Sequence, residues 1–124
     1  MNLYSVFLKN YNKNKKLIIN EKVYDYSDFR EKINILSSYL KKSKKKIFLL
    51  ITDDIFYMGV ALLSASKSGK TLVPLNKSLN ILQIKKIISK IKPDEILYSR
   101  NFKNDLKKIN KKIDLEQIIE RKYF

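Results

Sequence analysis

Two apolar runs separated by a polar turn constrain the fold more than any other feature of this sequence. The first run, IFLLI at Ile47–Ile51, is short and shows no alternation, which is typical of a strand covered on both faces in a parallel sheet. The second run, IFYMGVALLSAS, is long enough for a buried helix, and Gly69 and the β-branched segment TLVPL follow it. We expect Val60, Leu62 and Leu63 of this helix to be almost wholly buried and its small-residue face to lie close to another backbone. Strand, helix and strand in this order predict a right-handed crossover between parallel strands.

A second covering helix and a third strand are predicted downstream. From Leu79 to Lys92, isoleucines occupy one face and lysines the other, and Pro93 ends the pattern. EILY at 95–98 then predicts another short core strand. We therefore predict an α/β fold: a three-layer fragment whose short parallel sheet, with strands near 47–51, 71–75 and 95–98, is flanked by helices. Pro74 lacks a backbone N–H and should end the second strand.

The N-terminal part predicts a short helix, a hairpin and a longer helix. NLYSVFLKNY has apolar residues at helical spacing, and LIIN and KVYDY, on either side of Glu21, predict two short strands joined by a tight turn. Ser27 is the expected N-cap of the longer helix, with Asp28 in its first turn. That helix should end in the solvated lysine run KKSKKK. Its apolar face is formed by Phe29, Ile33, Leu36, Tyr39 and Leu40.

The C-terminal tail carries a weaker pattern. Phe102, Leu106, Ile109 and Ile113 predict one more helix, and Asp114, followed by Gln117, predicts a capped final one. The length of the chain fits one domain, and no linker or internal repeat interrupts it. We expect residues 1–124 to form a single domain and leave the arrangement of the tail from about residue 101 open.

Gly69-Lys70-Thr71 matches the end of the phosphate-binding P-loop. That motif needs another glycine five residues earlier, a strand before it and a helix after it. Here the earlier position is Ser64, and the predicted order is helix, glycine, strand. We therefore interpret Gly69 as the residue that ends a helix in the left-handed conformation, and we predict that no phosphate binds there.

Asp53 and Asp54 form the other candidate for chemistry. Adjacent carboxylates can bind a metal or transfer protons, but these two immediately precede a predicted helix, where carboxylates cap free N–H groups. The sequence contains no cysteine and no histidine, which excludes disulfides, thiolate metal sites and imidazole-based catalysis. We interpret the pair as helix capping and assign no catalytic, cofactor-binding or metal-binding residue.

The formal net charge of +15 raises the question of an anionic partner. A basic surface binds phosphate backbones through counterion release, but 24 of the 27 basic residues are lysines, and contacts to bases favour arginine. We expect no specific nucleic-acid partner, only nonspecific adsorption at low salt. The apolar runs are too short to span a bilayer and no secretory signal is visible, so we expect no membrane span and a cytoplasmic location.

The order of these features resembles the beginning of the AMP-forming adenylating enzymes, the superfamily of acyl-CoA synthetases, nonribosomal peptide adenylation domains and luciferases. The likeness runs from residue 3 to about residue 100. Besides the strand IFLLI and the elements from Asn80 to Tyr98, it is carried by VYDYS, by the small-residue helix Ala61 to Ser66, and by the turn and strand KSGKTLVPLN. The resemblance implies that SASKSGKTLVPLN is a helix-to-strand corner of the N-terminal subdomain.

The chemical motifs of that superfamily have no counterpart in these residues. The missing motifs are a Ser/Thr/Gly-rich phosphate loop ending in Pro-Lys-Gly, an aromatic residue with a Thr-Glu stretch, a ribose-binding Asp and a mobile C-terminal lysine. The resemblance therefore implies ATP and magnesium only for a complete enzyme, and no residue role is carried over. We expect the N-terminal portion of an AMP-dependent acyl or amino acid adenylating ligase, incomplete and inactive alone.

Two alternative functions stay open at this point. The chain could be a noncatalytic protein-docking module, or a companion chain of a split ligase that binds the polypeptide carrying the remainder. It could also be a small basic protein that binds nucleic acid or an anionic surface. The sequence does not decide whether the chain takes part in catalysis, and the acyl or amino acid substrate is not encoded in it.

Overall fold

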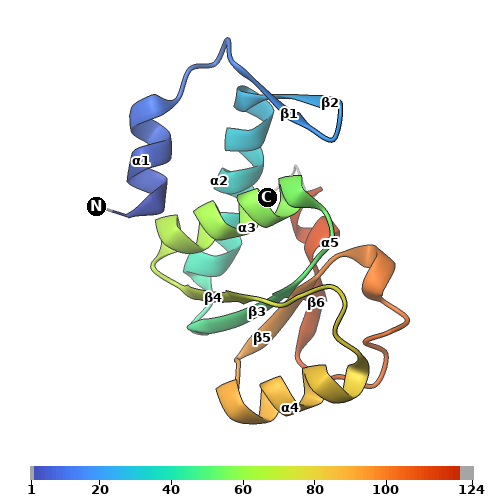
Figure 1. The fold of residues 1–124 in the computed structure, drawn as a ribbon. Helices are drawn as coiled ribbons and strands as arrows, with labels where there is room; N and C mark the ends of the chain where they lie inside the picture. The colour runs from blue at the N-terminus through green and yellow to red at the C-terminus, as the bar shows by residue number, and fades with distance from the viewer. Residues whose placement is uncertain (1, 121–124) are drawn as a thin grey trace.

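Four parallel strands form a central sheet with helices on both faces (Figure 1). The computed structural model describes residues 2–120. The strand order is β4-β3-β5-β6, so the chain crosses over β3 between β4 and β5. The strands are β3 (Ile47–Ile51), β4 (Thr71–Pro74), β5 (Glu95–Tyr98) and β6 (Lys112–Asp114). The α/β class, the three predicted strands and their common parallel sheet are confirmed, and β4 ends at the expected proline.

The strand β3 separates two hydrophobic layers because its side chains alternate between the faces of the sheet. Phe48 and Leu50 pack with the helices α2 (Tyr26–Lys42), α3 (Ile55–Ser68) and α5 (Leu115–Ile119). Leu49 and Ile51 pack with α4 (Ile81–Ile91) and the segment that follows β5. All four side chains are buried. This explains why IFLLI is apolar without alternation: both faces of the strand are covered.

The helix α3 (Ile55–Ser68) connects β3 to β4 and packs on α2 (Figure 1). Val60 and Leu63 are buried as expected, but Leu62 remains half-exposed, so the expectation that it is fully buried was wrong. The small-residue face was expected to lie against another backbone. Ser64 meets this expectation by donating a hydrogen bond to the carbonyl oxygen of Ile33 in α2. Gly59 instead faces the ring of Phe29.

The helix α4 (Ile81–Ile91) covers the opposite face of the sheet. Asn80 and Gln83 form a reciprocal capping box at its start, and Lys92 ends it in the left-handed conformation immediately before Pro93. Ile84 is the most deeply buried residue of the predicted isoleucine face. The predicted boundaries of this helix are therefore confirmed to within two residues.

The N-terminal elements lie on the α3 side of the sheet. They are α1 (Leu3–Asn10), the hairpin of β1 (Lys16–Ile19) and β2 (Lys22–Asp25), and α2 (Tyr26–Lys42). Asn20 and Glu21, at the hairpin turn, both have positive φ, as type I′ turns require. The expected N-cap at Ser27 was wrong. The N-cap is Asp25, which makes no side-chain capping bond, because its carboxylate accepts a 2.6 Å hydrogen bond from Lys16.

The tail differs from the sequence prediction. Turns and the strand β6 replace the helix predicted from Phe102 to Ile113. Leu106 and Ile109 pack with α4, whereas Ile113 packs on the other side of the sheet, and a single helix face could not reach both layers. Asp114 caps α5 (Leu115–Ile119) as predicted. Within residues 2–120, no helix is both long and apolar enough to cross a membrane.

Candidate functional site

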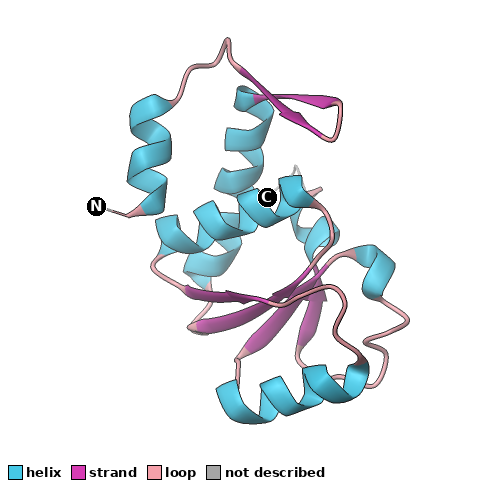
Figure 2. Cartoon of the chain, viewed as in Figure 1, coloured by secondary structure: helices cyan, strands magenta, loops and turns pink. Residues whose placement is uncertain are grey.

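The carboxyl ends of β3 and β5 are the place where the topology favours a ligand site. The connection after β3 runs into α3 on one face, and the connection after β5 runs along the α4 face (Figure 2). Ligands of open α/β sheets bind at such a switch point, outside the carboxyl ends of the strands. The residues that follow these two strands therefore form the candidate site.

Two hydroxyls form the buried base of this edge. Ser99, after β5, donates a short hydrogen bond to the Oγ1 atom of Thr52, after β3, and both residues are almost fully buried. Thr52 Oγ1 also accepts from the backbone N–H of Asp54 at 3.1 Å. These bonds hold the two strand ends together. Among the described residues, every buried side-chain donor or acceptor has a hydrogen-bond partner.

The predicted capping pair performs two different tasks. Asp54 is the N-cap of α3 and accepts from the backbone N–H of Tyr57 at 3.1 Å, so the capping prediction is confirmed for this residue. Asp53 caps nothing. Its carboxylate accepts a 3.0 Å hydrogen bond from the amide of Asn101, which follows β5. The pair therefore ends one helix and ties the β3 loop to the β5 loop.

Arg100 provides the cation at this edge, and carboxylates surround it. Its Nε atom donates to Asp114 at 3.0 Å, its guanidinium lies 3.8 Å from Glu120, and its backbone N–H donates to Glu116 at 2.9 Å. The hydrogen bond and charge of Asp114 raise the pKa of Arg100 above its ordinary value. Because acidic groups already engage the guanidinium, it is poorly placed to hold a phosphate.

Tyr57, at the first turn of α3, has the most strongly shifted pKa of this region. Burial, with smaller contributions from the charges of Glu116, Glu120 and Asp54, raises the pKa of its phenol to about 12. Burial also raises the pKa of Tyr98. Both phenols are therefore neutral at physiological pH and can donate a hydrogen bond there, but neither can serve as a base.

The carboxylates do not form a metal centre. No group of three or more Asp or Glu side chains within residues 2–120 is arranged to hold a metal ion. Each of the carboxylates described above instead accepts a hydrogen bond from the protein or neutralises Arg100. Such an arrangement stabilises loops and offers no open coordination position.

The segment Gly69-Lys70-Thr71 lies at the amino ends of the strands, away from this edge. Gly69 has φ 71° and ends α3, as predicted. The three backbone N–H groups donate to the carbonyl oxygens of Ser66, Ala65 and Lys46, in chain order. The ammonium of Lys70 donates to two further carbonyl oxygens. Every donor that a P-loop would aim at phosphate is thus already engaged within the protein.

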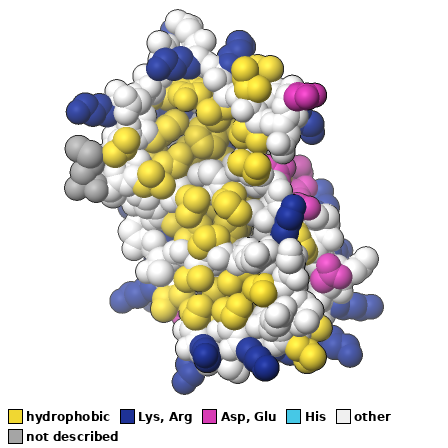
Figure 3. All heavy atoms as spheres, viewed as in Figure 1, with side chains coloured by type: hydrophobic (Ala, Val, Ile, Leu, Met, Phe, Trp, Pro, Cys, Tyr) yellow, Lys and Arg dark blue, Asp and Glu magenta, His cyan; other side chains and the backbone are white. Residues whose placement is uncertain are grey.

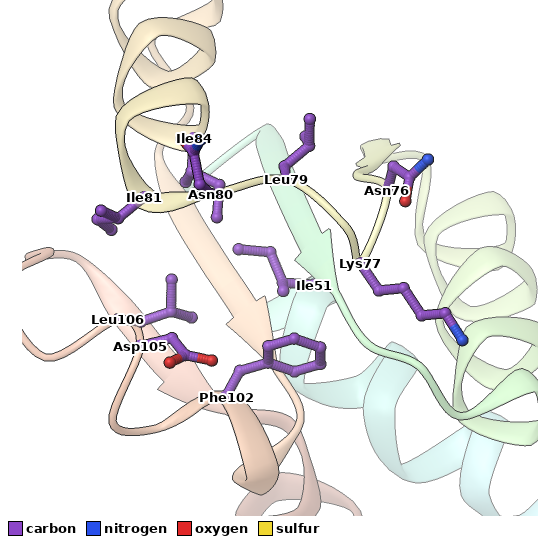
Figure 4. A pocket seen from close by; sticks show the side chains of 10 residues that line it. All are labelled: Ile51, Asn76, Lys77, Leu79, Asn80, Ile81, Ile84, Phe102, Asp105 and Leu106. Atoms are coloured by element: carbon purple, nitrogen blue, oxygen red, sulfur yellow. The ribbon is translucent and has the colours of Figure 1, made fainter.

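A hollow of about 340 Å³ opens beside the same edge, between the start of α4 and the segment after β5 (Figure 4). Figure 4 shows Ile51, Phe102 and Leu106 around its centre and Asp105 at its rim, whereas the side chain of Lys77 extends away from it. The lining combines apolar side chains with Asn76, Lys77, Asn80 and Asp105, so the hollow can accept an apolar group and offers a few polar contacts beside it.

Several solved structures share this fold over nearly the whole chain. A mutant form of coronafacic acid ligase from Pectobacterium brasiliense matches 98% of this chain with a TM-score of 0.82 and 16% identity. A benzoate CoA ligase from Burkholderia xenovorans matches 98% with a TM-score of 0.81 and 16% identity. The o-succinylbenzoate CoA synthetase of Bacillus subtilis, solved with its acyl-adenylate intermediate, matches all of it with a TM-score of 0.78 and 12% identity.

The chain has the fold of one part of the AMP-forming adenylating enzymes. It spans 28%, 29% and 34% of the length of the benzoate ligase, the coronafacic acid ligase and the o-succinylbenzoate synthetase. No protein-family model matches the sequence, and no curated protein matches it. The fold predicted from the order of strands, turns and helices is therefore confirmed by structure, at sequence identities too low to carry substrate or activity.

Most residues at the strand ends were not predicted as a group. The residues that directly follow the predicted strands are Thr52, Ser99, Arg100 and Asn101. Their position at the carboxyl edge of the sheet could have indicated that they lie close together. The contact of Arg100 with Asp114 could not be predicted from the sequence, because the segment that forms β6 was expected to be helical. Only the pairing of β5 with β6 brings these two residues together.

Proposed function

We propose that this chain is the leading scaffold of an AMP-forming ligase that adenylates an acyl or amino acid, and that it works together with a polypeptide carrying the rest of the enzyme. The observation that carries the proposal is the match of 98–100% of the chain to ligases solved as much longer chains. In this proposal residues 1–124 act as one domain in the cytoplasm, where ATP is supplied.

We further propose that the chain is inert alone. Adenylation needs donors for the triphosphate, a site for magnesium and a cation that stabilises the developing charge, all in one preorganised pocket. Here Arg100 is engaged by carboxylates, and the N–H groups around Gly69 are engaged by carbonyl oxygens. These contacts support a structural task for the chain, with ATP and magnesium bound by the companion.

The surface over α3 and β4 supports the idea of a companion. Figure 3 shows apolar side chains gathered over these elements on the face viewed. β4 is an edge strand of the described sheet, and an unpaired edge can be extended by another chain. Apolar side chains that stay partly exposed on these elements are Met58, Leu62, Leu72 and Val73.

ATP–pyrophosphate exchange tests this proposal directly. The chain, purified free of host ligases, is assayed alone and with a companion encoded beside it, using benzoate, anthranilate, o-succinylbenzoate and glycine as acids. We expect no exchange by either chain alone and exchange by the mixture, since binding of the scaffold stabilises the active fold. Exchange by residues 1–124 alone would contradict the proposal, as would a companion that is fully active without the chain.

A further inference from the structure

One end of the molecule concentrates positive charge far beyond the average of the chain. The segments 77–92 and 103–112 together contain ten lysines and one acidic residue, Asp105. They are far apart in sequence, but Leu106 and Ile109 pack in the same hydrophobic cluster as the isoleucines of α4. The outward sides of both segments therefore form one surface, which we call the lysine-rich end. Its lysines are Lys77, Lys85, Lys86, Lys90, Lys92, Lys103, Lys107, Lys108, Lys111 and Lys112.

Ion pairs within residues 2–120 leave the charge of the lysine-rich end without a partner. None of its ten lysines forms an ion pair with any residue from 2 to 120, whereas Lys16, Lys32 and Lys45 elsewhere do. Asp94, at the adjoining turn, is directed to the backbone N–H groups of residues 46 and 47. A concentration of ammonium groups without carboxylate partners creates a local positive potential that attracts an anionic surface.

The shape of this end fits a flat partner. Figure 1 shows α4 lying across the end of the molecule opposite α1 and the hairpin, and Figure 3 shows basic side chains projecting from that end. Leu82 is 68% exposed on α4. Lys85 and Lys86 follow it at the i+3 and i+4 positions and therefore share its face. Lysines attract acidic headgroups, and an exposed leucine beside them can enter the apolar boundary of the bilayer.

We propose that the outer face of α4 binds the surface of an anionic lipid bilayer, with the lysines held by acidic headgroups and Leu82 entering the interface. Nucleic acid fits the same surface less well. The two segments contain no arginine and no aromatic residue, so they lack both the bidentate donors that read bases and the rings that stack on them. This binding is independent of the ligase proposal and requires no companion chain.

Vesicle sedimentation tests the proposal with the full chain. We expect binding to phosphatidylserine–phosphatidylcholine vesicles, weakening as salt is raised, and none to phosphatidylcholine alone. Each lysine near an anionic bilayer strengthens binding roughly fivefold, so Lys85→Glu, Lys86→Glu and Lys90→Glu together should weaken it by at least about a hundredfold. The matched control combines Lys9→Glu, Lys13→Glu and Lys15→Glu, which change the net charge equally at exposed positions outside the lysine-rich end.

Leu82 provides a second, uncharged test. Leu82→Ser should weaken vesicle binding about tenfold, while the control Leu3→Ser, at another exposed leucine, should leave it unchanged. Absence of binding to the anionic vesicles at physiological salt would overturn the proposal. Equal losses of vesicle affinity in the two triple variants would also overturn the proposal, because the total charge of the protein would then explain binding. Tighter binding to duplex DNA than to the vesicles at the same salt would assign the surface to nucleic acid instead.

Discussion

The hydroxyl of Ser64 donates a 3.1 Å hydrogen bond to the carbonyl oxygen of Ile33, and both residues are completely buried where α3 crosses α2. This contact sets how closely the two helices approach. Replacing Ser64 with Ala should lower the free energy of unfolding by about 1 kcal/mol. Ser64→Val should cost about 1–3 kcal/mol, because it adds a methyl group at a fully buried position. Urea denaturation measures both, with Ser38→Ala on the exposed face of α2 as control.

A comparison of Leu50 with Leu62 tests the assignment of the core. Leu50 is fully buried in β3, whereas Leu62 is half-exposed on α3. Leu50→Ala should therefore destabilise the chain by about 2–5 kcal/mol, and Leu62→Ala should cost clearly less. Reversible urea melts of the two variants decide this. Equal losses would mean that Leu62 is buried in solution, as the sequence alone had predicted.

Gly69 tests the conformation of the corner between α3 and β4. A Cβ atom at this position would meet no neighbour within 4 Å, so the cost of Gly69→Ala should come from the positive φ alone and amount to about 1 kcal/mol. Gly69→Asn should cost less, because asparagine tolerates this conformation. Thermal melts give the order of stability. Tight ATP binding that disappears in Gly69→Ala would restore the P-loop interpretation.

We expect the protein to lose stability at high pH because of Tyr57. Its folded pKa, raised to about 12 mainly by burial, exceeds the ordinary tyrosine value near 10. Between these two values the unfolded chain loses the phenolic proton more readily than the folded chain, so stability falls as pH rises from about 10 to about 12. Tyr57→Phe should reduce this fall and remove the latest phenolate from the ultraviolet titration. An unchanged pH profile in the variant would contradict the burial of this phenol.

The sequence by itself determined the elements whose causes are local. Ile47–Ile51 is a strand because five apolar residues without alternation fit only a position covered on both faces. Asn80 begins α4 as its N-cap, and Pro93, which lacks a backbone N–H donor, follows its end. Gly69 ends α3 because glycine tolerates a positive φ. The order of these elements was sufficient to predict the parallel sheet and its resemblance to adenylating enzymes.

Only the tertiary structure decided the features that depend on residues far apart in the chain. Lys112–Asp114 is a strand because β5 supplies its hydrogen-bond partners, and no pattern in three residues could indicate that. Asp25 became the N-cap of α2 without a capping bond because Lys16, nine residues earlier, binds its carboxylate. Packing also brings three carboxylates around Arg100 and places the two lysine-rich segments side by side. The distribution of charge along the sequence does not indicate which distant segments share a surface.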